Sequence, residues 1–412
     1  MRIALFTNEY PPNVYGGAGV HVEYLARELS LAEGRAHHVD VLCFGEQNET
    51  HDNLRVRGIG PAAPVHAQDP RHARLLDAFA RNLAMAGAAE SPDIVHCHTW
   101  YSHLAGCISR PLTGARLVLT THSLEPHRPW KVEQLGTAYH ATAWIEKTAY
   151  QSADGVIAVS KAMKEDVQNL YGVSADRVRV IHNGIDPDEY RPRQAPETLR
   201  RLGVDPDVPI VLFVGRITRQ KGILHLVRAI RFLTPGVQVV LCAGAPDTEA
   251  IGEEMRLLVD DVKRDTAARV IWIREMLPKA DTIALYSHAA VFVCPSVYEP
   301  FGIINLEAMA CETPVVAAAV GGIPEIVVPG KTGFLVQFKA EGGGSAEPQK
   351  PDDYSRALAA AVNELMAAPE RRQAMGKAAR ARVLEHFSWR HIAEVTLEFY
   401  RELVRAREGV RA

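Results

Sequence analysis

The sequence of 412 residues lacks the features that mark several large classes of protein. No run of eighteen apolar residues occurs, because the richest stretch, 315–328, is interrupted by glycines, a proline and a glutamate. We therefore expect no membrane-spanning helix and no stable membrane association. The net charge is only −3, which argues against a nucleic-acid partner. The N-terminal apolar stretch ends before Glu9, too soon for a secretory signal, so we expect a cytoplasmic protein.

The sequence also lacks the cysteine spacing that marks metal-binding or redox sites. The six cysteines include no Cys-x-x-Cys pair, and most of them stand among apolar residues of the kind found in strands. Cysteines in such surroundings are typical of buried thiols in a reducing compartment. We therefore interpret them as core residues with no metal or redox function. They stand at positions 43, 97, 107, 242, 294 and 311.

The length and the patterning predict two α/β domains. With 47% hydrophobic residues, a chain this long can bury one core in each of two ordinary domains. Short β-branched runs alternate with amphipathic stretches in both halves, the pattern of parallel βαβ units. A polar, proline-containing segment at 183–196 separates the halves. We expect two Rossmann-like, doubly wound domains facing a central cleft, at 1–186 and 187–387, and an amphipathic helix at 388–412 that returns to the first domain.

The individual elements are predicted from the same alternation. The first half should contain helices at 20–30, 70–86 and 161–170, and the glycine-rich segment 340–345 should form a surface loop. Expected strands lie at 3–7, 39–44, 94–97, 116–121, 155–160 and 178–182 in the first half, and at 209–214, 237–243, 270–273, 290–295, 314–318 and 333–336 in the second.

A glycine-rich turn follows the first expected strand. Gly16 and Gly17 directly precede a helical pattern, and glycines there allow close approach of a ligand, while a helix N-terminus offers N–H groups to an anion. Such turns are also common in Rossmann-like sheets without a ligand, so the purely structural reading stays open. The segment is not Gly-x-Gly-x-x-Gly, which disfavours a nicotinamide dinucleotide and hence a dehydrogenase.

Two cations follow the first strand of the second half. Arg216 and Lys221 lie in a turn that ends at Gly222. Arginine offers planar, forked donors and lysine a point charge, and both could neutralise a diphosphate leaving group as it gains charge. The alternative is a solvated loop with spare charges.

A further group of polar residues follows the strand at 290–295. Glu299 lies in the connecting loop, and a helix is predicted to open near Gly302, with Glu307 just over one turn inside it. The N–H groups of Gly302 and Ile303 suit a phosphate, and the carboxylates can accept hydrogen bonds from sugar and ribose hydroxyls. We assign this segment, including Phe301, to substrate binding. The alternative is a pair of exposed glutamates favoured by the helix dipole.

Several histidines and aspartates have spacings found in metal sites. His96 and His98 have the spacing of a zinc pair on a strand, but no convincing third ligand follows, so we predict no metal site. His122 directly follows the strand at 116–121, where a polar residue can also have a purely structural role. The segments 186–188 and 205–207 imitate an Asp-x-Asp metal motif, but their central prolines place them in turns, where we read the aspartates as caps.

Together these motifs resemble a known family. The two glutamates with seven residues between them, the turn at 215–222 and the Gly16-Gly17 loop are similar to the retaining nucleotide-sugar glycosyltransferases of the two-domain GT-B fold, over essentially the whole chain. Within that group the sequence most resembles the actinobacterial-type glycogen synthases, also described as α-maltose-1-phosphate synthases. The segments that carry this finer resemblance are 8–12, 243–248 and 320–325.

The chain departs from the other family of bacterial and plant starch and glycogen synthases at two places. Their Lys-x-Gly-Gly-Leu motif appears here as Val14-Tyr15-Gly16-Gly17-Ala18, which lacks the lysine. Their His-x-His-Asp-Trp motif appears at 96–100 with Thr99 in place of the acid. Acceptor contacts of those enzymes therefore cannot be transferred to these positions.

The resemblance implies a retaining glucosyl transfer from ADP-glucose that requires no metal or other cofactor. The acceptor would be glucose 1-phosphate, giving maltose 1-phosphate, or the end of an α-1,4-glucan; a homodimer is also compatible. Among the implied roles, His122 contacts the donor sugar, Glu299 its hydroxyls and Glu307 the ribose. Arg216 and Lys221 neutralise the diphosphate, and Asn183, at the domain junction, joins the substrate-binding residues.

Two alternatives remain beside this interpretation. Another GT-B hexosyltransferase could transfer mannose or N-acetylglucosamine to an inositol phosphate or a lipid. A noncatalytic nucleotide-binding protein would tolerate loss of the cations and glutamates, so their joint presence argues against it. We expect cations at Arg110, Arg116, Arg128 and Lys131 on the acceptor-side domain, which would favour a compact phosphate acceptor over a neutral glucan.

Overall fold

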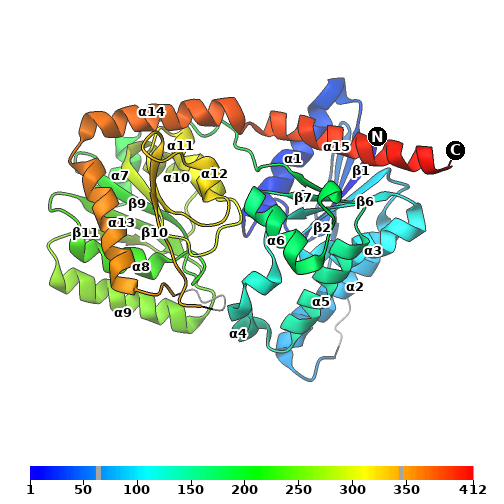
Figure 1. The fold of residues 1–412 in the computed structure, drawn as a ribbon, viewed down its shortest axis with the longest axis horizontal. Coiled ribbons are helices and arrows are strands. Elements are labelled where there is room, and N and C mark those ends of the chain that lie inside the picture. The colour runs from blue at the N-terminus through cyan, green and yellow to red at the C-terminus, as the bar shows by residue number, and fades with distance from the viewer. Residues whose placement is uncertain (62–65, 343–346, 412) are drawn as a thin grey trace. The chain divides into compact units, whose positions relative to one another are not determined.

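The computed structural model describes residues 1–61, 66–342 and 347–411. The chain forms two compact units, each built around its own sheet (Figure 1). The first unit comprises Met1–Gly184 and Trp389–Ala412, and the second Ile185–Ser388. The boundaries expected from the sequence, 186 and 387, lie within two residues of these. The segments that enter and leave the second unit are hydrogen-bonded to each other at its boundary. The Ile185 N–H donates to the carbonyl oxygen of Phe387 at 2.7 Å.

The first unit contains an eight-stranded sheet in the order β3-β4-β2-β1-β5-β6-β7-β8. All neighbouring pairs are parallel except β3 with β4. The expected strands are present, whereas β3 and β4 were missed because β3 is fully exposed and β4 alternates apolar residues with arginines. The strands are β1 (Arg2–Phe6), β2 (His38–Phe44), β3 (Asn48–His51), β4 (Leu54–Ile59), β5 (Ile94–His98), β6 (Arg116–Thr121), β7 (Gly155–Ala158) and β8 (Val178–Val180).

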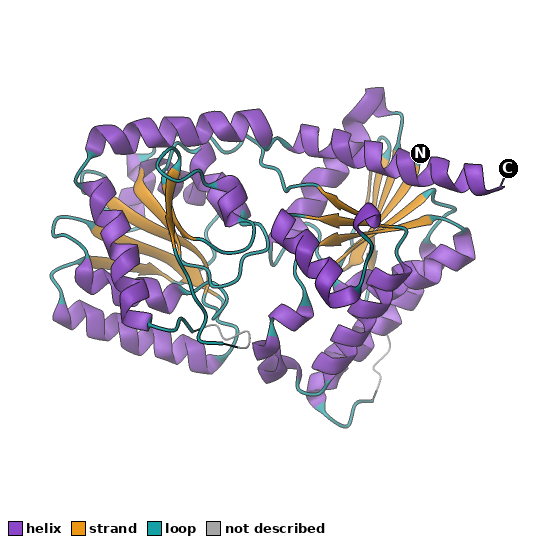
Figure 2. Ribbon diagram, viewed as in Figure 1, coloured by secondary structure: helices purple, strands orange, loops and turns teal. Residues whose placement is uncertain are grey.

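Helices cover both faces of this sheet (Figure 2). The last helix of the chain packs against the first, where the rings of Trp389 and Tyr24 stack with centroids 5.7 Å apart. Apolar residues of α15, including Ile392 and Phe399, share one buried cluster with Leu5 of β1. The helices of this unit are α1 (Gly17–Arg35, with a break at 32–34), α2 (Ala73–Ala88), α3 (Trp100–Thr113), α4 (Val132–Leu135), α5 (Ala138–Ser152), α6 (Lys161–Tyr171) and α15 (Trp389–Arg411).

The second unit contains a six-stranded, fully parallel sheet in the order β11-β10-β9-β12-β13-β14. Its strands are β9 (Ile210–Arg216), β10 (Gln238–Gly244), β11 (Arg269–Ile273), β12 (Ala289–Cys294), β13 (Val315–Ala318) and β14 (Gly333–Val336). Its helices are α7 (Pro196–Arg201), α8 (Ile223–Ala229), α9 (Glu249–Asp265), α10 (Lys279–His288), α11 (Ile303–Ala310), α12 (Ile323–Ile326), α13 (Pro351–Met366) and α14 (Pro369–His386).

The strand orders decide where a ligand can bind in each unit. Strands β2, β3 and β4 lie on one side of β1, and the chain then restarts on its other side at β5; in the second unit the same reversal separates β9 from β12. In open α/β sheets, ligands bind beyond the carboxyl ends of the strands that flank such a reversal. The prediction of two doubly wound sheets is therefore confirmed, and it directs attention to the loops after β1, β5, β9 and β12.

Several smaller predictions can also be compared with the structure. All six cysteines are unpaired thiols and five are buried; burial raises the pKa of Cys43 to about 12. Asp186 and Asp205 accept hydrogen bonds from backbone amides two residues further on, at 3.0 Å each, which confirms them as caps. The predicted loop 340–345 lies partly outside the described residues. Within the described ranges, no helix has both the length and the apolar character needed to cross a bilayer.

Candidate active site

Three loops meet at the carboxyl edge of the second sheet. A Cβ atom at Gly222, whose φ is +61°, would overlap the carbonyl oxygen of Pro295, and one at Gly321, with φ +52°, would overlap that of Glu299. The Val297 N–H also donates to the carbonyl oxygen of Gln220 at 2.9 Å. The loops after β9, β12 and β13 thus pack backbone against backbone, and only glycine fits at the two contact points.

This packing brings two of the predicted residues together. The Lys221 ammonium donates to Oε2 of Glu299 at 2.7 Å, and the Ser296 hydroxyl donates to the same oxygen at 3.1 Å. The side chains of Lys221 and Glu299 are 19% and 8% exposed. The sequence placed both residues in the site but did not show that they form an ion pair, because 78 positions separate them.

The second predicted cation also has an acidic partner. Arg216, the last residue of β9, donates to Asp247 at 2.8 Å, and both side chains are about one quarter exposed or less. Asp247 directly precedes Thr248, which caps α9. The sequence marks this segment only by its resemblance to a family, and no local signal identifies the aspartate as the partner of Arg216.

Helix α11 begins where the sequence predicted. Gly302 is its N-cap with φ +106°, and the first turn contains no acidic residue, so its leading amides can donate to an anion. Phe301, predicted to bind substrate, is 1% exposed and packs against Phe387 with ring centroids 6.1 Å apart. Its side chain is therefore part of the core, because the loop turns inward before the helix starts.

Glu307 lies between two tyrosines that sequence reasoning missed. The Tyr190 hydroxyl donates to Oε1 at 3.2 Å and the Tyr286 hydroxyl to Oε2 at 2.9 Å. Burial raises the pKa of this carboxyl above its usual value. Both oxygens are thus oriented by neighbours from distant parts of the second unit, and no local sequence signal marks either tyrosine.

In the first unit, the glycine turn is held by a carboxylate. Oε2 of Glu9 accepts hydrogen bonds from the amides of Tyr15 at 2.9 Å and Gly16 at 2.8 Å, and α1 begins at Gly17. The amide of Gly16, which we predicted to be a substrate-binding residue, is therefore occupied by the chain's own carboxylate. Glu9 was missed because nothing in the local pattern shows that its side chain folds back on the turn.

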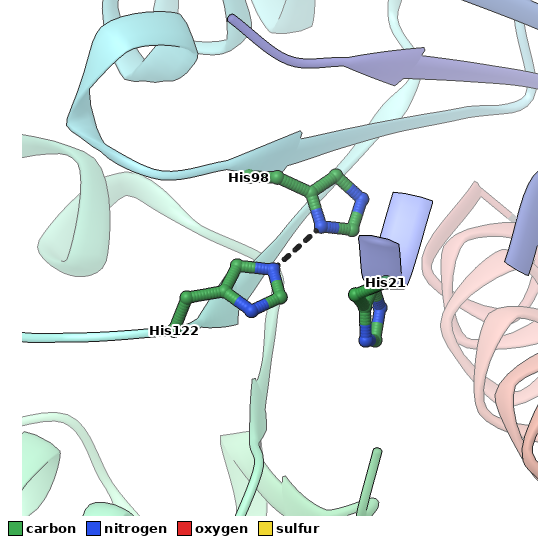
Figure 3. A group of neighbouring side chains, drawn as sticks. All are labelled: His21, His98 and His122. Atoms are coloured by element: carbon green, nitrogen blue, oxygen red, sulfur yellow. Dashed lines mark hydrogen bonds between the residues drawn. The ribbon is translucent and has the colours of Figure 1, made fainter. Parts of the chain in front are cut away.

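Three histidines gather at the carboxyl edge of the first sheet (Figure 3). His98 ends β5, His122 follows β6, and His21 lies on α1. Nδ1 of His98 and Nε2 of His122 are 3.0 Å apart and hydrogen-bonded, while Nδ1 of His21 lies 2.7 Å from Oδ1 of Asn183. Asn183, predicted to bind substrate, is 5% exposed and orients His21.

Burial controls the ionisation of this cluster. It lowers the pKa of His21 to about 4 and holds the pKa values of His98 and His122 well below 6.5. All three rings are therefore neutral near pH 7, the form that binds transition metals. One nitrogen from each ring lies within 4.8 Å of the others, so the cluster has ligands of the right type for such an ion.

This group differs from the pair of His96 and His98 that the sequence suggested. His96 bonds to the Tyr400 hydroxyl at 2.6 Å and to the Thr120 hydroxyl at 2.7 Å, so both its nitrogens are engaged in the core. His98 instead meets His21, which is 77 positions earlier in the sequence. The sequence could not identify this partner because α1 and β5 come together only through the strand order.

The expected grouping of cations on the first unit is wrong for two of its members. Arg110 and Arg116 both pair with Asp154, at 2.9 Å each. Arg116 begins β6 and therefore lies at the amino edge of the sheet, whereas the loop that follows β6 lies at the carboxyl edge. Arg128 lies in that loop, where it donates to the Ser123 hydroxyl at 3.1 Å and lies 3.6 Å from the buried carboxylate of Glu125. Parallel topology separates these positions although they are close in sequence.

Comparisons with known proteins agree with this architecture. The family model described as Glycosyltransferase Family 4 matches residues 15–189, and the model described as Glycosyl transferases group 1 matches residues 194–382. Among solved structures, sucrose-phosphate synthase from Thermosynechococcus elongatus is similar over 98% of this chain and all of that one, with a TM-score of 0.78 and 28% identity.

Sequence relatives extend over the whole chain. An α-maltose-1-phosphate synthase of Mycolicibacterium smegmatis is 48% identical over 98% of this chain and 100% of its own length, and that of Mycobacterium tuberculosis is 45% identical over the same shares. A glycogen synthase of M. tuberculosis is 30% identical over 97% of this chain and 94% of its own. The protein belongs to the nucleotide-sugar glycosyltransferases of the GT-B fold, in the family of the α-maltose-1-phosphate synthases.

Proposed function

We propose that this protein is a retaining glucosyltransferase that moves glucose from ADP-glucose to glucose 1-phosphate and so forms maltose 1-phosphate. The observation that carries the proposal is the full-length similarity to two enzymes named α-maltose-1-phosphate synthase. The cations at the carboxyl edge of the second sheet support it. A nucleoside diphosphate gains negative charge as it leaves the sugar, and positioned cations stabilise that charge. The transfer requires no metal or other cofactor.

The donor diphosphate is assigned to the N-terminus of α11. The amides of Gly302 and Ile303 donate to phosphate oxygens there, and Lys221 and Arg216 supply positive charge. Each cation already has a carboxylate partner in the second unit. An ordered side chain loses less conformational entropy when the donor binds, so these ion pairs preorganise the site.

The carboxylates are assigned to the sugar and the ribose. Lys221 and Ser296 both donate to Oε2 of Glu299, and Oε1 of the same residue is assigned to a sugar hydroxyl. Glu307 accepts from the ribose hydroxyls, oriented by its two tyrosines. Neutral His122 is assigned a contact with the donor sugar.

Retention follows from a same-face substitution. The acceptor hydroxyl oxygen bonds to the anomeric carbon as the bond from that carbon to the diphosphate oxygen breaks, and the hydroxyl proton passes to the departing phosphate. A glycosidase-like route would need a carboxylate nucleophile with a separate acid. Glu299 accepts a hydrogen bond from Lys221 and Glu307 accepts hydrogen bonds from two tyrosines, so neither carboxylate is assigned as a nucleophile.

A second acceptor, the non-reducing end of an α-1,4-glucan, is favoured by the similarity to a glycogen synthase at 30% identity. The stronger similarity to the maltose-1-phosphate synthases favours the phosphate acceptor. A phosphate would also form charge-assisted hydrogen bonds with Arg128, which a neutral glucan would not need.

The test pairs ADP-glucose or UDP-glucose with glucose 1-phosphate or glycogen and identifies the product by NMR. We expect the highest kcat/KM with ADP-glucose and glucose 1-phosphate, and an α-configured maltose 1-phosphate. A preference for glycogen would refute the acceptor, a preference for UDP-glucose the donor, and a β-linked product the retention. Activity lost after chelation and regained with Mg²⁺ would refute metal-independent transfer.

A further inference from the structure

The hydrogen bond between His98 and His122 raises the question of which ring donates. Nδ1 of His98 faces Nε2 of His122 at 3.0 Å, and two neutral imidazoles can share this bond in either direction. The direction determines which nitrogen of His122 carries its proton. It therefore decides whether His122, a partly exposed residue, offers a donor or an acceptor at Nδ1.

The buried side of His98 decides between the two directions. Its ring is 0% exposed, and Nε2 has no hydrogen-bond partner among the described residues. If His122 donated, the proton of His98 would have to be on that nitrogen, as a buried N–H without an acceptor. Nε2 of His98 stays without a described partner in both directions, and a buried donor or acceptor left unsatisfied costs about 1–3 kcal/mol. Orphaned N–H groups are rarer in proteins than under-satisfied acceptors, which favours the direction that leaves Nε2 as the acceptor. The proton of His98 therefore belongs on Nδ1.

His21 restricts the orientation of the accepting ring. The ring of His21 meets that of His122 edge to face, with centroids 4.7 Å apart and an interplanar angle of 76°. His21 is itself held by Asn183, whose amide oxygen can only accept, so Nδ1 of His21 donates. The edge contact limits rotation of the His122 ring, while His98 supplies the directional hydrogen bond.

We propose that His98 is a positioning residue: by donating from Nδ1 to Nε2 of His122, it fixes His122 as the Nδ1–H tautomer with a hydrogen-bond donor available to the substrate. This inference rests on the proposed contact of His122 with the donor sugar. It goes beyond that contact because it names the proton's location and the residue that sets it. Second-layer hydrogen bonds commonly select a histidine tautomer in this way.

The test uses two amides that differ in reach. In His98→Asn, the amide nitrogen stands two bonds from Cβ, as Nδ1 does, and can still donate to His122. In His98→Gln, the amide stands one bond further out, at the level of Nε2. We expect His98→Asn to stay within about threefold of the wild-type kcat and His98→Gln to lose about 10- to 100-fold, with little change in donor KM.

The control is a buried histidine that makes no such bond. His103 is 1% exposed, with neither ring nitrogen hydrogen-bonded among the described residues, and its ring packs against Tyr150. His103→Gln measures the cost of placing a glutamine at a buried histidine position, and we expect it to keep the wild-type kcat. Equal losses in His98→Asn and His98→Gln would overturn the positioning role.

A direct measurement separates this inference from the proposed function. Nitrogen-15 NMR of histidine-labelled, substrate-free protein should show His122 protonated at Nδ1 in the wild type and in His98→Asn, and a mixture of tautomers in His98→Gln. Protonation at Nε2 in the wild type would refute the inference whatever the enzyme transfers. If His122→Ala instead kept full turnover while the tautomer was as predicted, the proposed contact with the sugar would fail and the hydrogen bond would stand.

Discussion

Replacement of Lys221 by methionine should affect turnover and stability for two different reasons. The substitution keeps an apolar stem but removes the ammonium that lies 2.7 Å from Glu299. If this ammonium stabilises the leaving diphosphate, kcat should fall by about 10²-fold or more, or about 2.7 kcal/mol in the activation barrier. Oε2 of Glu299, whose side chain is 8% exposed, accepts hydrogen bonds from Lys221 and Ser296, and the substitution leaves only the one from Ser296.

The stability effect can be bounded from the burial of the pair. Removal of one partner from a buried ion pair costs about 3–5 kcal/mol. Because Lys221 is 19% exposed, we expect the lower end, about 3 kcal/mol, in the free energy of unfolding measured in urea. Adding Glu299→Gln removes the uncompensated charge, so the double variant should recover most of this stability. It should not recover turnover, because the charge opposite the diphosphate is still missing and the glutamate assigned to a sugar hydroxyl is replaced as well.

A surface lysine provides the matched control. Lys350 lies 3.6 Å from Asp353, with side chains 78% and 68% exposed, and exposed pairs contribute about 0–1 kcal/mol. Lys350→Met should therefore leave both kcat and stability close to wild type. Near-normal turnover of Lys221→Met would reduce Lys221 to a structural cation. Restored turnover in the double variant would show that the unpaired glutamate, rather than the lost phosphate contact, slowed the enzyme.

Three further predictions follow from the same loops and from the buried histidines. Arg216→Ala should lower kcat by about 10²-fold with the fold intact, as checked by circular dichroism; unchanged turnover would contradict a role in the diphosphate site. Gly222→Ala should destabilise the fold by about 3 kcal/mol or more, because the added Cβ would overlap the carbonyl oxygen of Pro295. Gly172→Ala, at φ +67° with open space around it, should cost only about 1–2 kcal/mol. Equal costs in thermal or urea unfolding would refute the close approach of the backbone at Gly222. The folded-state pKa of His21 is lowered to about 4 from 6.5, so the unfolded chain takes up the proton first as the pH falls. The contribution of His21 to stability is therefore complete above pH 6.5 and declines by about 1.4 kcal/mol per pH unit toward pH 4. His21→Gln should flatten that decline in urea titrations at several pH values, and an unchanged slope would show that His21 does not cause it.

Local pattern was sufficient for the architecture and for much of the site in the second unit. Apolar runs alternate with amphipathic stretches, and successive parallel strands place their carboxyl ends on one edge of a sheet. Residues at or shortly after the carboxyl ends of strands, such as Arg216, Lys221 and Glu299, are therefore recognisable as neighbours from the sequence alone. Glycine turns are also readable, since Gly222 and Gly302 adopt positive φ values. The missed hairpin of β3 and β4 lacks the continuous apolar run that marks buried strands.

The partners of these residues depended on the tertiary structure. Asp247 meets Arg216 across 31 positions and Asn183 meets His21 across 162, and no periodicity carries such information. Arg110 and Arg128 are close in sequence, yet they lie at opposite edges of one sheet because strand β6 separates them. The sequence by itself determined which elements form and which strand ends carry polar residues, since these follow from local propensity and burial. Strand order and loop packing determined which side chains touch, because only they bring distant segments within hydrogen-bonding distance.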